Sequence, residues 1–143
     1  MTGPLVETVS RLLLAPTLVV ALAILVKGYS DVGDGFTAGV VAALGVVLQY
    51  TALGSSRVRR ALPVGAALPV ALAGLALALG VAFLPLLWGA APVTHYPRPG
   101  SSVVHVGTAE LLTAVAFDIG VFLLVLGAAV GIVDAVAGAE TKR

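Results

Sequence analysis

The chain has 143 residues, of which 59% are apolar and 10% charged, and its mean hydropathy is +1.11. Soluble domains carry about a quarter charged residues, so this composition excludes a soluble globular protein and predicts that the bilayer is the solvent. Cysteine is absent, which excludes a disulfide framework and thiol chemistry, and a net charge of +1 gives no reason to expect a nucleic acid partner.

The first apolar segment is short. Arg11 and Lys27 bracket fifteen uncharged residues, whereas a transmembrane helix needs about 20. Both charged side chains can snorkel to the membrane interfaces and extend the span. A topology of three spans, in which this segment does not cross, is therefore the alternative to four.

The other apolar segments follow in chain order. A turn rich in glycine and short polar residues leads into the second, a loop with three arginines into the third, and a proline-rich stretch into the fourth. We expect an all-α membrane protein that forms one integral membrane domain over residues 1–143, with four transmembrane helices. Their expected bounds are about 12–27, 36–53, 65–88 and 109–133.

The placement of arginine and lysine predicts the orientation, because cytoplasmic loops carry an excess of both. With four spans, the two termini and the central loop share one side of the membrane. Six basic residues fall on that side: Arg11, Arg57, Arg59, Arg60, Lys142 and Arg143. Only Lys27 and Arg98 fall on the other. We therefore expect both termini in the cytoplasm.

Asp118 is the strongest candidate for chemistry. It lies nine residues past the expected start of the last span, close to the middle of the membrane. A carboxylate there costs roughly 2.5–3.5 kcal/mol on insertion scales, and such residues usually face protein or water. Two interpretations stay open. Asp118 carries protons or contacts a coupling ion, or it is structural and only bonds a neighbouring helix.

Other polar residues are weaker candidates. Glu110, about 12 Å before Asp118 along a helix, could relay protons to the surface. It could also simply interact favourably with the dipole at the N-terminus of its helix. Asp34 could join an ion path or only cap the second helix. His95 and His105 have no paired carboxylate, so we expect no metal site. No nucleophile is paired with a base, so we expect neither enzyme activity from this chain nor a cofactor.

Glycines predict how the last span packs. At about 100° per residue, Gly120, Gly127, Gly131 and Gly138 fall on the face opposite Asp118. A glycine face suits close helix contact in lipid, while the face with the carboxylate avoids lipid. We expect that three companion helices from one small chain cannot cover both faces, which predicts an obligate subunit of a larger assembly or a homo-oligomer.

Two sequence blocks resemble one family. Residues 28–39, Gly-Tyr-Ser-Asp-Val-Gly-Asp-Gly-Phe-Thr-Ala-Gly, look like the turn entering the second helix of the B subunit of Mrp-type sodium/proton antiporters, the MnhB family. Residues 116–123, Ala-Phe-Asp-Ile-Gly-Val-Phe-Leu, look like that family's Phe-Asp-Ile-Gly-Val signature. The motif positions are Gly33, Gly35, Phe36, Gly39, Phe117, Asp118 and Gly120. The first block departs from the pattern at Tyr29, Val32 and Asp34, where histidine, proline and glycine are expected.

The resemblance implies a subunit of a complex that exchanges Na⁺ and H⁺ across a prokaryotic cell membrane, with other membrane subunits and the lipid bilayer as partners. It implies that the chain lines or supports an ion path that includes Asp118. Equivalent subunits of hydrogenase-type or other redox-driven ion pumps are an alternative, and so is a purely structural subunit. Small multidrug exporters, which also have four helices in a short chain, are a further alternative. They are expected to carry their key carboxylate in the first helix, and residues 12–26 have none, which argues against that class.

Overall fold

The computed structural model describes residues 3–27, 34–89, 91–92 and 109–140, the last range with side chains for 115–139 only. Regular structure in these residues is helical, without strands. The elements are α1 (Pro4–Lys27), α2 (Asp34–Leu53), α3 (Ser55–Ala61), η1 (Val64–Ala66), α4 (Ala67–Phe83), η2 (Leu84–Trp88) and α5 (Ala109–Glu140). Among the described residues, α1, α2, α5 and the continuous unit Val64–Trp88 are long and apolar enough to cross a membrane. The predicted fold of four transmembrane helices is confirmed.

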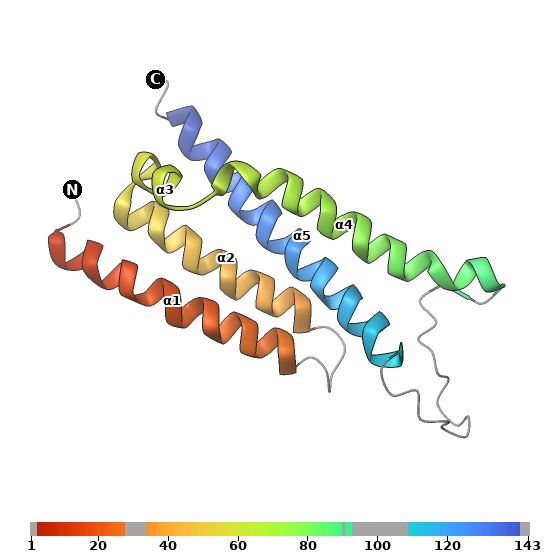
Figure 1. Ribbon diagram of the computed structural model, residues 1–143. Coiled ribbons are helices and arrows are strands. Elements are labelled where there is room, and N and C mark those ends of the chain that lie inside the picture. Colours follow the sequence, from red (N-terminus) through yellow and green to blue (C-terminus); the bar gives the residue numbers. More distant parts are fainter. Residues whose placement is uncertain (1–2, 28–33, 90, 93–108, 141–143) are drawn as a thin grey trace.

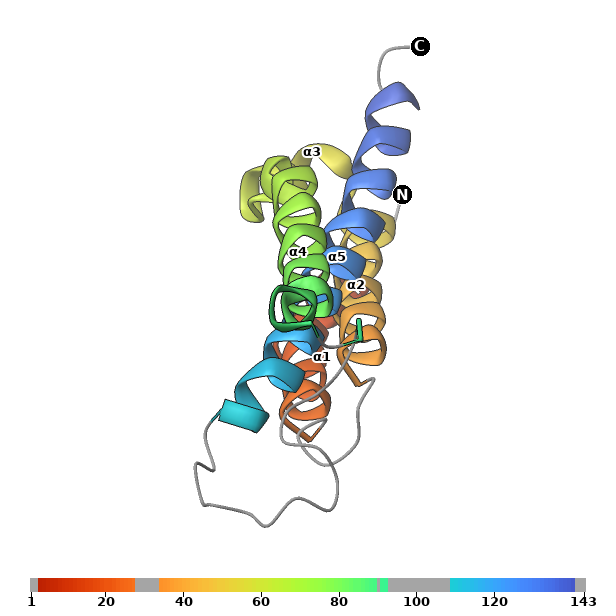
Figure 2. The ribbon, with the colours of Figure 1, turned by 90° about the vertical axis from the view of Figure 1, so that its right-hand side faces the viewer.

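The four long helices lie in a row in the order α1, α2, α5, α4 (Figure 1). The view turned by 90° shows the same helices one behind another, with α4 in front (Figure 2). α2 packs on α1 and α5, and α5 packs on α2 and α4, whereas α1 and α4 do not touch within the described residues. α5 is therefore an inner helix although it comes last in the chain.

α2 and α5 run in the same direction along their contact. Three pairs of contacts define the register: Gly35 with Asp118, Gly39 with Phe122 and Val125, and Tyr50 with Asp134. The offset between partners is nearly constant, so the two helices stay in contact over almost the whole length of α2. Small residues make this possible, because glycine and alanine let helix backbones approach closely in lipid.

The first helix is longer than the apolar segment that predicts it. α1 begins at Pro4 and has 24 residues, which is ample for a bilayer that requires about 20. Proline suits a first helical position, where its missing N–H would have no intrahelical partner. Residues 4–11, some of which are polar, form the first turns of α1. The first segment is therefore long enough to cross.

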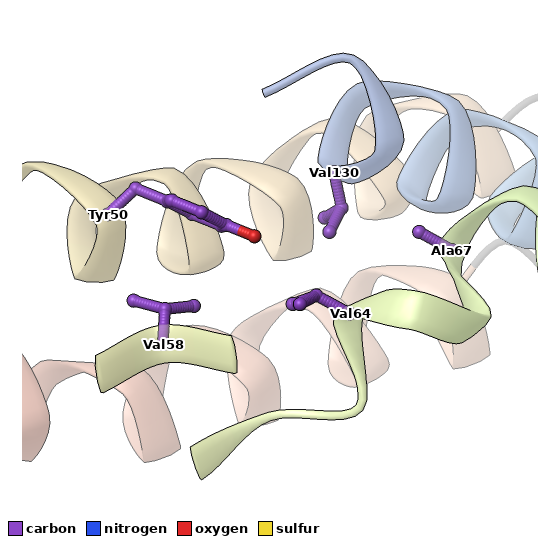
Figure 3. Close-up of a cluster of buried hydrophobic side chains, with 5 residues drawn as sticks. All are labelled: Tyr50, Val58, Val64, Ala67 and Val130. Atoms are coloured by element: carbon purple, nitrogen blue, oxygen red, sulfur yellow. The ribbon is translucent and has the colours of Figure 1, made fainter. Parts of the chain in front are cut away.

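The arginine-rich loop forms a short helix, α3, across one end of the long helices, where α2 ends and the third span begins (Figure 1). We call this the α3 end of the row. Gly54 ends α2 with a φ of 80°, which favours glycine, and lets the chain turn into α3. Val58 on α3 is buried in an apolar cluster that also holds Tyr50, Val64, Ala67 and Val130 (Figure 3). This cluster fixes α3 beside the end of α2, the end of α5 and the start of the third span.

Candidate functional site

Asp118 is buried at the contact of α5 with α2. Its exposed fraction is 4%. Gly35, in the first turn of α2, approaches the backbone of Asp118 so closely that an added Cβ would overlap the Asp118 carbonyl oxygen. The two backbones are in direct contact, so no lipid separates α2 from α5 at the carboxylate.

Along the helix axes, Asp118 lies level with the start of α2, and Gly120, two residues further on, lies against Gly74 and Ala78 near the middle of the third span. α5 has 32 residues and α2 has 20, so the first turns of α5 extend beyond α2. The expectation that Asp118 lies near the middle of the membrane stays a prediction.

The two blocks that carried the family resemblance meet in the structure. Gly35 contacts Asp118, and one turn later Gly39 faces the next turn of α5. A Cβ at Gly39 would lie 2.9 Å from Cβ of Val125 and 3.0 Å from the carbonyl oxygen of Phe122. The glycines of the first block therefore hold α2 against the helix that carries the second block.

The other predicted site residues have different surroundings. Asp34 is the first residue of α2 and is half-buried. Phe117 is half-buried, whereas Phe36 is 58% exposed. Glu110 lies in the first turn of α5, but its side chain lies outside the described residues, as do Gly33 and both histidines.

α4 covers most of the glycine face of α5, while Gly138 lies against Arg59 of α3. A Cβ at Gly120 would lie 2.7 Å from the amide nitrogen of Ala78, and one at Gly127 would lie 2.5 Å from the carbonyl oxygen of Ala67. Gly131 is in a looser position, because its Cβ would meet only Ala67 Cβ, at 3.8 Å. The backbones of α4 and α5 thus touch over about two turns.

This packing corrects the argument that the two faces of the last span require an outside partner. The chain covers both of them itself, with α2 at Asp118 and α4 at the glycines. This packing argument did not consider that the last helix lies inside the row, between two helices that carry small residues of their own. The expectation of a larger assembly therefore rests on the family and not on the packing of α5.

A second polar cluster joins three elements at the α3 end of the row. Asp134 of α5 accepts a hydrogen bond from the Tyr50 hydroxyl of α2 at 2.7 Å through Oδ1. The same oxygen accepts one from Nε of Arg59 on α3 at 2.7 Å, and the Asp134 carbonyl oxygen accepts one from Nη2 at 2.9 Å. The hydrogen bond to Asp134 raises the pKa of Arg59 above its ordinary value, so the guanidinium stays charged.

Sequence reasoning missed this cluster. The expected last span ends at residue 133, which leaves Asp134 just outside it. α5 continues to Glu140, so Asp134 is a second carboxylate on the same helix. The spacing of the two carboxylates could have indicated that Asp134 belongs to the same helix. Sixteen residues separate it from Asp118, which correspond to about 24 Å of helix, less than the roughly 30 Å thickness of the hydrocarbon core.

Comparisons with known proteins identify a family and several similar proteins. The family described as "Domain related to MnhB subunit of Na+/H+ antiporter" matches residues 5–131. The chain is 29% identical over 133 residues to the B subunit of a Na(+)/H(+) antiporter of Alkalihalophilus pseudofirmus, covering 93% of this chain and 91% of the relative. It is 30% identical over 140 residues to the protein of the same name in Bacillus subtilis, covering 95% and 94%. The probable A/B subunit of a K(+)/H(+) antiporter of Rhizobium meliloti is 32% identical over 129 residues, which are 90% of this chain and 13% of that protein.

Proposed function

Because the chain belongs to the family of domains related to the MnhB subunit of Na⁺/H⁺ antiporters, we propose that it is a membrane subunit of a monovalent cation/proton antiporter complex. Other membrane subunits of that complex are its partners, and Na⁺ and H⁺ are the transported ions. The chain lies in the cell membrane with four spans and contributes to the ion path without a catalytic centre of its own.

The observation that carries a role in the ion path is the burial of Asp118 between helices. A carboxylate inside a membrane span is costly and marks an ion or proton pathway by default. At 4% exposure, Asp118 is shielded from lipid by the contact of α2 with α5. We assign it the binding of a proton or of the coupling cation.

This chain supplies only part of a path. Residues 119–133 of α5 contain no ionisable side chain, so about 24 Å of helix separates Asp118 from Asp134. Arg59 and Tyr50 hold Asp134 in a structural cluster. An ion that reaches Asp118 therefore continues through groups of a neighbouring subunit, which explains why such a chain works within a complex.

The position of Asp118 also assigns the side from which it exchanges. The arginines of α3, the start of α1 and the end of α5 share one end of the row (Figure 1). By the excess of basic residues this end is cytoplasmic. Asp118 lies toward the opposite end, level with the first turn of α2, so we assign it to the outer half of the path.

The test is Asp118→Asn in the assembled complex. Asparagine keeps the shape and most hydrogen bonds of aspartate but cannot ionise. We expect Na⁺/H⁺ exchange in inverted vesicles to be lost while the chain still co-purifies with its neighbours. Asp118→Glu should retain part of the activity with a changed pH optimum, because the carboxyl group moves by one methylene and its solvation changes.

Asp134→Asn is the matched control, since it removes the second carboxylate of the same helix. We expect it to leave exchange near the level of the unmodified complex, provided that the chain remains assembled. Wild-type exchange by an assembled Asp118→Asn complex at every pH would assign Asp118 a purely structural role and end the proposed part in the path.

A further inference from the structure

A cavity of about 160 Å³ lies between α1, α2 and α3 at the α3 end of the row. Arg11 and Arg57 line it, together with Gln49. A second hollow shares Arg11 and Arg57 and adds Arg60. The two hollows share Arg11 and Arg57, so we treat them together as one depression lined by three guanidinium groups from two helices.

The positive charge in this depression is only partly balanced. Arg57 pairs with Glu7 of α1. Nε of Arg60 donates to the backbone carbonyl of Ser56 at 3.1 Å, which leaves its charge in place. Among the described residues, no carboxylate forms an ion pair with Arg11 or Arg60. Three guanidinium groups thus face one carboxylate, which suits an anionic ligand.

The remaining walls are apolar. Leu14, Leu53 and Leu62 line the cavity. The Gln49 amide is already engaged within the protein, because its Nε2 donates a hydrogen bond to the carbonyl oxygen of Ser10 at 2.7 Å. Leu12, next to Arg11 on α1, is 69% exposed, so an apolar side chain of the outer surface adjoins one of the lining arginines.

We propose that this depression, formed by Arg11, Arg57 and Arg60 with its leucine walls, binds the headgroup of an anionic phospholipid such as phosphatidylglycerol. Guanidinium groups match phosphate oxygens with two parallel hydrogen bonds. Basic pockets between transmembrane helices at the membrane surface bind anionic headgroups. The cavity is about half the size of the smallest sites for drug-sized ligands, roughly 300 Å³, so it accepts a phosphate group while the acyl chains stay on the apolar surface of α1.

The continuity with the lipid-facing surface favours a lipid over an acidic protein segment. A protein segment would need further polar partners around the arginines, whereas the other lining residues are apolar apart from Gln49. A free phosphate would use the arginines but gain nothing from the leucines. The lipid satisfies both features, since its phosphate meets the charges and its acyl chains meet Leu12 and Leu14.

Native mass spectrometry of the full chain tests the proposal, with phosphatidylglycerol, phosphatidylcholine and soluble glycerol phosphate as the three probes. We expect one phosphatidylglycerol to bind more tightly than phosphatidylcholine, and glycerol phosphate to bind weakly. A charge near an anionic headgroup contributes about 1 kcal/mol, so Arg11→Gln and Arg60→Gln should each weaken phosphatidylglycerol about fivefold. Arg11→Lys should keep most of the affinity, because it keeps the charge.

Lys27→Gln is the matched control, because it removes one charge at the opposite end of α1 and should leave the binding unchanged. Circular dichroism of each variant checks that the helices are retained. Equal losses in Lys27→Gln and Arg11→Gln, or unchanged binding in Arg11→Gln and Arg60→Gln, would overturn the site. Binding of glycerol phosphate as tight as that of phosphatidylglycerol would assign a free anion instead. Loss of a neighbouring subunit in Arg11→Gln, with no lipid bound to the wild-type complex, would make the arginines a protein contact.

Discussion

The backbone of Gly35 on α2 lies against the backbone of Asp118 on α5, and the contact leaves no space for a methyl group at position 35. The glycine is thus required by the close approach of two helices. The same contact buries the carboxylate on which the proposed ion path depends. A change at Gly35 therefore tests the packing around Asp118 without touching its charge.

Gly35→Ala should destabilise the chain. The added methyl group must push α2 away from α5, and overpacking of this kind costs about 1–3 kcal/mol. The control is Gly80→Ala on α4, where nothing lies within 4 Å of the added Cβ and better helix propensity adds roughly 0.5–1 kcal/mol. Thermal unfolding of the purified chain in detergent measures both. Equal stability of the two variants would contradict the direct backbone contact.

Gly127→Ala and Gly131→Ala should behave differently although both lie on the glycine face of α5. The methyl group at position 127 meets the backbone of α4 at 2.5 Å, whereas at position 131 it makes an ordinary contact at 3.8 Å. We expect Gly127→Ala to lower the unfolding temperature and Gly131→Ala to leave it unchanged or raise it. A destabilised Gly131→Ala variant would show that a closer neighbour covers this position.

The sequence was sufficient to predict the four helices, because each is a long apolar segment and the bilayer dictates its length. It did not predict α3, since Arg57, Arg59 and Arg60 suggest a loop when their partners are unknown. In the structure, Arg57 pairs with Glu7 and Arg59 with Asp134, and Val58 fills the apolar cluster between them. Those partners lie far away in the chain, so no local pattern reveals them.

For the candidate site, the sequence identified the residue but not its surroundings. Asp118 stood out as a single charge in an apolar segment. Its position along the helix axes relative to the other helices depends on where α2 begins relative to α5, and the hydropathy of α5 contains no information on that offset. The order α1, α2, α5, α4 was equally hidden, because it follows from which small residues face each other across helices.

The topology can be tested with single cysteines, since the chain has none of its own. Ser56 is exposed on α3, and Ser101 falls between η2 and α5 in the chain. A membrane-impermeant thiol reagent added to intact cells should label Ser101→Cys and not Ser56→Cys, because the excess of arginine predicts that α3 lies on the cytoplasmic side. Labelling of Ser56→Cys alone would reverse the orientation and move Asp118 to the inner half of the path.

The last prediction concerns the cluster of Tyr50, Arg59 and Asp134, which joins α2, α3 and α5. Tyr50→Phe removes the hydroxyl that donates to Asp134 Oδ1, and a hydrogen bond to a charged group contributes about 1.5–3 kcal/mol. In an Asp134→Ala background the same substitution should cost much less, because its acceptor is already gone. Thermal unfolding of the two single variants and the double variant closes this cycle. The bond from Arg59 is more exposed, so its share should be smaller and should decrease with added salt. An equal cost of Tyr50→Phe in both backgrounds would mean that the hydroxyl and the carboxylate do not interact, and this end of α2 would then be held to α5 by the apolar cluster alone.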